Sequence, residues 1–137
     1  MIRAVIDTNV LVSGLLSASG NEALIILAVH QGLVRPCLSE AIIAEYAEVL
    51  ARPKFSFPPG EVGALIAMLR RNGEFHRTKD SSAISPDPGD SKFLQCAQAA
   101  GAEFIITGNK RHFPDTPYGS THVVNAGEVL DRITREL

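Results

Sequence analysis

The sequence predicts an α/β protein in which a parallel sheet of about five strands lies between helices on both faces, as a three-layer sandwich. Short stretches rich in β-branched residues alternate along the chain with longer stretches of helical periodicity, which is the pattern of βαβ units. The first stretch, residues 2–6, is almost wholly apolar and ends abruptly at Asp7, as expected of a strand buried on both faces. With 137 residues, the chain has the length of one domain, which we place at residues 1–137.

The predicted strands are short, and each is bounded by polar or turn-forming residues. After the first, they are expected at residues 33–38, 74–77, 102–107 and 121–124. We take residues 2–6 as the central strand. Open α/β sheets bind ligands beyond the carboxyl ends of their strands, which is where Asp7 lies. Every other acidic residue is therefore judged by whether its helix or strand brings it to the same edge.

The predicted helices are recognised by their capping residues and apolar stripes. Ser39 is a good N-cap for a helix over residues 40–51, Pro59 begins one that runs to residue 72, and Gly101 ends one that begins at Asp90. Asn21 is expected to cap a helix that is apolar nearly all round, which makes that helix either deeply buried or packed on a second subunit. Two further helices are expected at residues 10–16 and 126–137.

Composition excludes several classes of protein. No apolar run approaches the roughly 18 residues of a membrane span, so we expect no membrane association. Cys37 and Cys96 form no CxxC pair and are expected to be reduced and buried, as in a cytoplasmic protein. The four histidines share no metal-ligand spacing, which argues against zinc. The net charge of −2 gives no whole-molecule case for nucleic-acid binding, so RNA contacts would need a local basic rim.

Helix rotation selects one acid from the helix over residues 40–51. Successive residues are about 100° apart around a helix, which puts Glu45 at the border of the apolar stripe. Glu48 lies roughly opposite that stripe, and Glu40 lies closer to Glu48 than to the stripe. Of the three, only Glu45 is expected to turn inward.

Asp90 lies on the buried stripe of its own helix, in the first turn. Taken alone, Asp90 and Asp7 are most simply N-caps, and Glu45 is a rim charge. Taken together, three carboxylates at one edge of a sheet repel one another and lose hydration. Both effects raise their pKa values unless a cation is present. Hard divalent ions take oxygen ligands, so the set favours Mg²⁺ or Mn²⁺, with chemistry suited to phosphodiester cleavage.

Four blocks of this sequence resemble PIN domains, and especially the VapC-like PIN family of toxins from toxin–antitoxin systems. A lone Asp-Thr-Asn is weak evidence, but the blocks occur together over nearly the whole chain, in the family's order and spacing. They run from Asp7 to Val12, from Ser39 through Glu45 to Phe55, from Asp87 to Ala97, and from Ile106 to Phe113.

This resemblance implies an endoribonuclease that depends on Mg²⁺ or Mn²⁺. The family's first three acids fall on Asp7, Glu45 and Asp90, which are the implied metal ligands. The fourth catalytic position is Asn109, where many members carry Asp. Asparagine ligates through its carbonyl or holds a water molecule, but it removes one negative charge. Asp87 lies in a proline-rich loop and is interpreted as a turn residue.

Further residues are expected around the implied site. Thr8, Asn9 and Thr107 match polar positions that line the family's site. Basic residues near the same edge are candidates for contacts with RNA phosphates, namely Lys92, Lys110, Arg111 and His112. The resemblance also implies a homodimer that is neutralised by a protein antitoxin.

Two other functions compete with the nuclease. A phosphatase of the haloacid dehalogenase type would use Asp7 as its nucleophile, but it needs a second Asp at the place of Asn9. A degenerate PIN domain would bind RNA or a protein without cutting, and Asn109 together with the acidic net charge keeps this alternative open.

Overall fold

The structure, a computed structural model, describes residues 1–78 and 88–137 and has the predicted α/β architecture. In this part of the chain, five strands form one sheet in the order β3-β2-β1-β4-β5, and every pairing between them is parallel. The first predicted strand is therefore central. The strands are β1 (Ile2–Ile6), β2 (Val34–Leu38), β3 (Glu74–Phe75), β4 (Phe104–Ile106) and β5 (His122–Val124).

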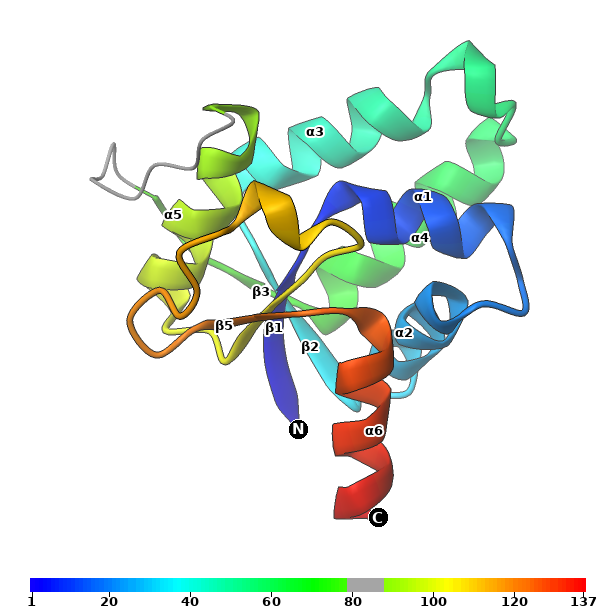
Figure 1. The fold of residues 1–137 in the computed structure, drawn as a ribbon. Coiled ribbons are helices and arrows are strands. Elements are labelled where there is room, and N and C mark those ends of the chain that lie inside the picture. The colour runs from blue at the N-terminus through cyan, green and yellow to red at the C-terminus, as the bar shows by residue number, and fades with distance from the viewer. Residues whose placement is uncertain (79–87) are drawn as a thin grey trace.

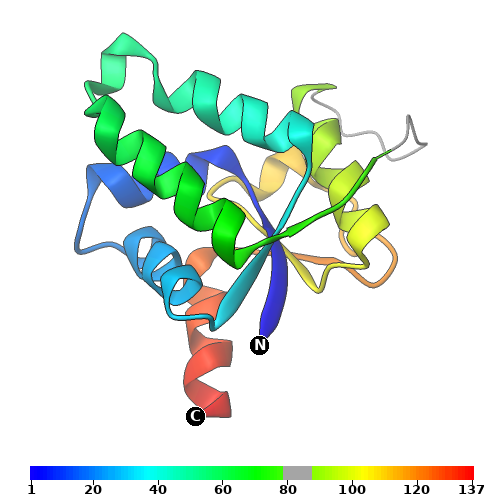
Figure 2. The ribbon, with the colours of Figure 1, turned by 180° about the vertical axis from the view of Figure 1, so that it is seen from behind.

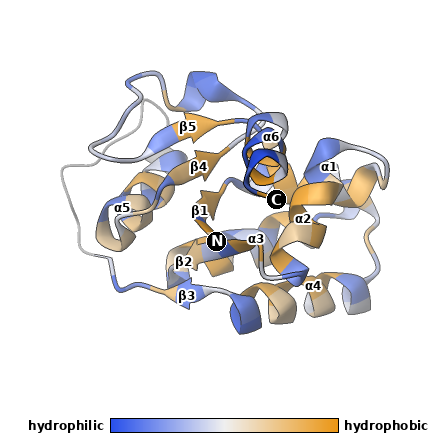
Figure 3. Cartoon of the chain, turned by 90° about the horizontal axis from the view of Figure 1, so that it is seen from below, coloured by the Kyte–Doolittle hydropathy of each residue, from blue (hydrophilic) through white to orange (hydrophobic). Residues whose placement is uncertain are grey.

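Helices cover both faces of the sheet, as predicted. Helix α5 packs on one face, and α2, α4 and α6 lie on the other (Figure 3). Helix α3 runs across the end of the sheet where β1 finishes (Figure 1). In the described residues the helices are α1 (Thr8–Leu16), α2 (Asn21–His30), α3 (Glu40–Leu50), α4 (Pro59–Asn72), α5 (Ser91–Ala100) and α6 (Ala126–Glu136).

The central strand is buried on both faces, which explains its nearly unbroken apolar sequence. Ala4 and Val5 are completely inaccessible to solvent, although their side chains point to opposite faces. Hydrophobic residues accordingly lie on the strands and on the inward sides of the helices, and hydrophilic residues lie outside (Figure 3). This rigid layer holds the end of β1 in place.

Helix α2 differs from its prediction in two respects. Its N-cap is Gly20, which has extended backbone angles, and Asn21 is already helical, with its amide directed at the start of α6 beside Gly127. The predicted cap was therefore wrong by one residue, because the Asn21 side chain meets another helix instead of its own backbone. Ile25 and Val29 are buried, whereas Leu24 and Leu27 are 45% and 46% exposed, so only one side of this apolar helix lies in the core.

The connections between strands reverse direction at β1. The chain passes from β1 through α1 and α2 to β2 on one side, and α5 later delivers β4 to the other side. Such a reversal opens a crevice beyond the carboxyl ends of the two neighbouring strands. The two chain termini lie at the opposite end of the molecule (Figures 1 and 2). The edge of the sheet where β1 and β4 end is therefore the expected place for a site.

Two sequence predictions need a further remark. Most of the loop expected between residues 78 and 89, including Asp87, lies outside the described residues. None of the helices in residues 1–78 and 88–137 is long and apolar enough to span a membrane alone, and α1 with α2 meets that criterion only as a pair bent by 105°.

Candidate metal centre

Asp7 lies at the reversal point, immediately after β1. It occupies the N-cap position of α1, but its side chain makes no capping hydrogen bond. Instead, the hydroxyl of Thr107, the first residue after β4, donates to Asp7 Oδ2 at 2.7 Å. Ile6 pairs with Ile106 in the sheet, so this register places the two following residues side by side. Asp7 is 4% exposed and Thr107 is fully buried, so the carboxylate is held from the sheet side.

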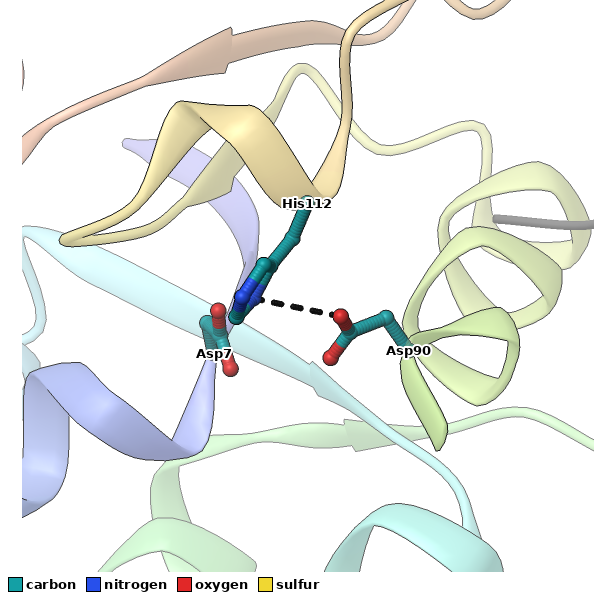
Figure 4. Close-up of side chains that lie close together, drawn as sticks. All are labelled: Asp7, Asp90 and His112. Atoms are coloured by element: carbon teal, nitrogen blue, oxygen red, sulfur yellow. Dashed lines mark ion pairs between the residues drawn. The ribbon is translucent and has the colours of Figure 1, made fainter. Parts of the chain in front are cut away.

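Asp90 comes from the start of α5, the helix that packs on one face of the sheet. It ends a short 3₁₀ helix (Pro88–Asp90) and is the N-cap residue of α5, yet its side chain makes no capping hydrogen bond. Its Oδ2 lies 3.2 Å from Nδ1 of His112, at the distance of an ion pair (Figure 4). Both aspartates thus occupy N-cap positions, as expected. The N-cap interpretation does not explain their contacts with Thr107 and His112.

Asp7, Asp90 and His112 form one compact group. One ligand atom from each lies within 4.8 Å of the others, so the three can hold a metal ion together. Figure 4 shows their side chains converging from the end of β1, the start of α5 and the short 3₁₀ helix after β4. Residues 83 positions apart in the sequence, Asp7 and Asp90, are thus brought to the edge of the sheet where they were predicted.

Glu45 lies beside this group but is not part of it. As predicted from helix rotation, it is half-buried, whereas Glu40 and Glu48 are exposed. Its Oε2 accepts a hydrogen bond from the Thr8 hydroxyl, and its Oε1 accepts one from Lys92 at 2.8 Å. The adjacent Tyr46 is fully buried and donates its hydroxyl to the carbonyl of Ile6, which ties α3 to the end of β1.

Asn109 fixes the orientation of His112. The Asn109 side-chain oxygen accepts from the backbone N–H of Arg111 at 3.1 Å, which leaves its amide nitrogen 3.1 Å from Nε2 of His112. An amide nitrogen only donates, so Nε2 of His112 accepts from Asn109, and Nδ1 of the same ring faces Asp90. Asn109 therefore acts on Asp90 through the histidine.

The sequence did not predict that His112 would lie with Asp7 and Asp90, and it indicated His112 only as a candidate for contact with RNA phosphates. It lies in the 3₁₀ helix Lys110–His112, three residues after Asn109. Side chains three residues apart lie above one another in a 3₁₀ helix. Had a 3₁₀ turn been predicted there, this spacing would have placed His112 over Asn109, but three irregular residues carry no periodic signal.

Burial makes ionisation of Asp7 unfavourable. Loss of solvation on burial raises the pKa of Asp7, and the nearby negative charge of Glu45 raises it further. The hydrogen bond from Thr107 and the proximity of His112 act in the opposite direction, but burial dominates. A cation bound between Asp7 and Asp90 would remove this penalty, and their oxygen atoms are ligands that hard divalent ions prefer. The residues present therefore fit a divalent metal ion.

The other predicted residues take structural or peripheral positions. Asn9 accepts a hydrogen bond from the backbone of Gly108 at 3.0 Å, which joins the segments following β1 and β4. Lys110 pairs with Glu128 of α6. Arg111 is exposed beside Asn109, and within the described residues its guanidinium makes no ion pair. Of the four candidates for contacts with RNA phosphates, Lys92 and Lys110 thus pair with Glu45 and Glu128, His112 faces Asp90, and Arg111 is exposed.

Comparison with known proteins supports an assignment of family. The family model described as PIN domain matches residues 3–111, which include all four residues predicted to be catalytic. No curated protein is significantly similar to the chain.

Proposed function

This chain belongs to the PIN-domain family, a family of nucleases, and we propose that it is a metal-dependent endoribonuclease. The observation that carries the proposal is the convergence of the buried Asp7 and Asp90 with His112 at the carboxyl edge of a parallel sheet. Asp7 and Asp90 hold the ion, Mg²⁺ or Mn²⁺, and Glu45 acts through water. When bound, such an ion supplies the Lewis acid that polarises a phosphodiester and makes a water molecule more acidic.

The residues around the aspartates prepare this site. Thr107 orients the Asp7 carboxylate, and Asn109 holds His112 against Asp90. Arg111, exposed at the same edge, is placed to contact a phosphate of the substrate. A toxin role, with a homodimer and a protein antitoxin in the cytoplasm, extends the proposal and rests on the resemblance of the four sequence blocks alone.

The test of the proposal is cleavage of a labelled single-stranded RNA by the purified protein. We expect internal cuts in the presence of Mn²⁺ or Mg²⁺ and none in excess EDTA. A DNA strand of the same sequence is the control substrate and should be cut less than the RNA. Cleavage that persists in EDTA would rule out the metal centre, and preferential cleavage of the DNA would rule out the ribonuclease assignment.

A second candidate function is an RNA-binding module that does not cut. Asn109 favours it, because a neutral amide replaces a carboxylate at the edge of the site, and so does Lys92, because it neutralises Glu45. In the same assay this function would give RNA retention, measured by gel shift, without any product at saturating metal.

Thr107→Val is expected to weaken Mn²⁺ binding by about 10- to 100-fold, as is typical when a residue that orients a metal ligand is lost. Valine preserves the shape of Thr107 but cannot donate to Asp7. The measurement is Mn²⁺ affinity by calorimetry. The matched control is Thr121→Val, because Thr121 is also buried and donates to the carbonyl of Ala102, away from the aspartates. Equal affinities for the two variants would show that Thr107 does not orient a ligand.

A further inference from the structure

A pocket lies beyond the ends of β2 and β3, at the same edge of the sheet as the candidate metal centre. Its volume is about 480 Å³, which is within the usual range for a site that binds a small molecule. Its lining comes from the start of α3 and from the residues that end and follow β3, among them Ser39, Glu40, Ala41, Phe75, His76 and Arg77. These residues are distinct from those of the metal centre.

The pocket is close enough to the metal centre for one strand of nucleic acid to reach both. Only β2 separates β3 from β1, and neighbouring strands are about 4.8 Å apart, so the ends of β1 and β3 lie about 10 Å apart across the sheet. Ala41 lines the pocket, and Glu45 follows one turn later on the same side of α3, about 6 Å along the axis. Helix α3 therefore connects the pocket to the metal centre.

The wall of the pocket that follows β3 is held firmly by the sheet. The backbone N–H of His76 donates to the carbonyl of Leu38 at 2.8 Å, which extends the pairing with β2 beyond Phe75. Nε2 of His76 lies 3.2 Å from Glu74 Oε1, and Nε of Arg3 in the central strand donates to the same oxygen at 2.9 Å. The pocket is therefore largely preformed, as ligand sites usually are.

Phe75 gives the pocket an aromatic lining residue. It is 44% exposed, and among the exposed large hydrophobic residues in the described part of the chain it is the only aromatic one. The guanidinium of Arg70 lies over its ring, 5.2 Å from the ring centroid. Exposed aromatic rings accompanied by arginine are surfaces on which single-stranded nucleic acids stack a base.

The two charged residues of the lining suit different parts of a nucleotide. Arg77 is exposed, and its guanidinium is a donor of the kind that contacts phosphate oxygens. Glu40 only accepts hydrogen bonds, so it suits the amino group of a base and not a phosphate. The lining thus combines a ring for stacking, a cation for a phosphate and an acceptor for a base edge.

From this arrangement we infer that the pocket binds one unpaired nucleotide of a single-stranded RNA, with its base against Phe75 and its phosphate at Arg77, while a neighbouring part of the strand reaches the metal centre. The inference rests on the proposed function and specifies its substrate, because a base paired within a duplex does not fit into such a pocket. Phe75 and Arg77 bind the substrate and take no part in the cleavage step.

The first experiment measures the affinity of the full chain for a short, fluorescently labelled single-stranded RNA by anisotropy. It is done in excess EDTA, so that the result does not depend on a bound metal ion. Phe75→Leu should weaken binding by about fivefold or more, which is the lower end of what one stacked base contributes. Arg77→Gln should also weaken binding and reduce its dependence on salt, because one phosphate contact is lost.

The matched control is Phe55→Leu, the same change in the 3₁₀ helix Pro53–Phe55, which follows the opposite end of α3. It should keep the RNA affinity of the wild type. Circular dichroism establishes that each variant is folded.

The second experiment locates the bound nucleotide on the wild-type chain. Adenosine 5′-monophosphate is titrated in EDTA while the backbone amides are followed by nuclear magnetic resonance. Saturable shifts are expected at residues 39–41 and 75–78. Ribose 5-phosphate lacks the base and should bind about fivefold or more weakly, because it cannot stack.

The outcomes separate this inference from the proposed function. Unchanged RNA affinity in folded Phe75→Leu, equal losses in Phe75→Leu and Phe55→Leu, or nucleotide shifts away from the pocket would overturn the inference, whether or not the protein cuts RNA. Binding at the pocket without RNA cleavage in Mn²⁺ would support the inference and overturn the nuclease. If Phe75→Leu does not fold, the titration of the wild type decides: shifts at the pocket support the inference, and their absence overturns it.

Discussion

Asp7→Asn is expected to reduce RNA cleavage by about 10³-fold or more while making the metal-free protein more stable. The loss of activity follows because a neutral amide in place of a carboxylate forfeits several kcal/mol of charge stabilisation by the metal, and each 1.36 kcal/mol is about a factor of ten in rate. The measurement is the initial rate of RNA cleavage at saturating Mn²⁺.

The gain in stability has a separate cause. Burial raises the pKa of Asp7 above its ordinary value of 3.8, so in the fold the neutral form is favoured. The stability that the protonated group contributes is complete below pH 3.8 and is lost as the pH rises through the raised pKa. Above pH 3.8 the ionisation of Asp7 therefore costs folding free energy, a cost that Asn does not carry. The variant should have the higher melting temperature in EDTA, by a margin that shrinks as the pH falls towards 3.8.

The control for this prediction is Asp131→Asn, the same chemical change at an exposed position of α6. It should alter neither the rate nor the melting temperature. If Asp7→Asn were less stable than the wild type in EDTA, the Asp7 carboxylate would stabilise the fold. Its burial would then not be a cost that the fold bears for the sake of a functional site.

Asp90→Asn is expected to remove most of the stabilisation that a metal ion gives the wild type. An ion that binds only the folded state, at 100 times its Kd, raises the free energy of unfolding by about 2.7 kcal/mol. If the variant binds 100-fold more weakly, the same ion concentration contributes only about 0.4 kcal/mol. The amide also gives up the charge that faces His112 at 3.2 Å. The measurement is chemical denaturation with and without Mn²⁺.

Two comparisons make that result specific. Asp131→Asn should keep the full stabilisation by Mn²⁺. Asp90→Asn in EDTA should unfold in a single cooperative transition, because asparagine is as favourable as aspartate at the N-cap position of α5. A variant still stabilised by about 2.7 kcal/mol would exclude Asp90 as a ligand.

The fold was predictable because its signals are local. An apolar run that stops at Asp7 indicates a buried strand. Ser39 and Pro59 mark the starts of α3 and α4, and Gly101 marks the end of α5, as the structure confirms. Rotation about the helix axis was also sufficient to choose Glu45 over Glu40 and Glu48. Such signals depend only on neighbours within one element, whose geometry is known in advance.

The contacts between elements were not predictable in the same way. His112 lies with the two aspartates, and Lys92 pairs with Glu45, although the sequence made both only candidates for contacts with RNA phosphates. Each of these pairs links two elements, and strand order and helix placement decide which side chains meet across the crevice.

The sequence by itself determined which elements form and which acids end or line them, since strand burial, capping and helix rotation follow from residues close together in the chain. Only the tertiary structure decided that Asp7 and Asp90 share a group with His112 while Glu45 is held aside by Thr8 and Lys92. The reason is physical: charges and hydrogen bonds act over a few ångströms in space, and the distance along the chain does not determine that separation.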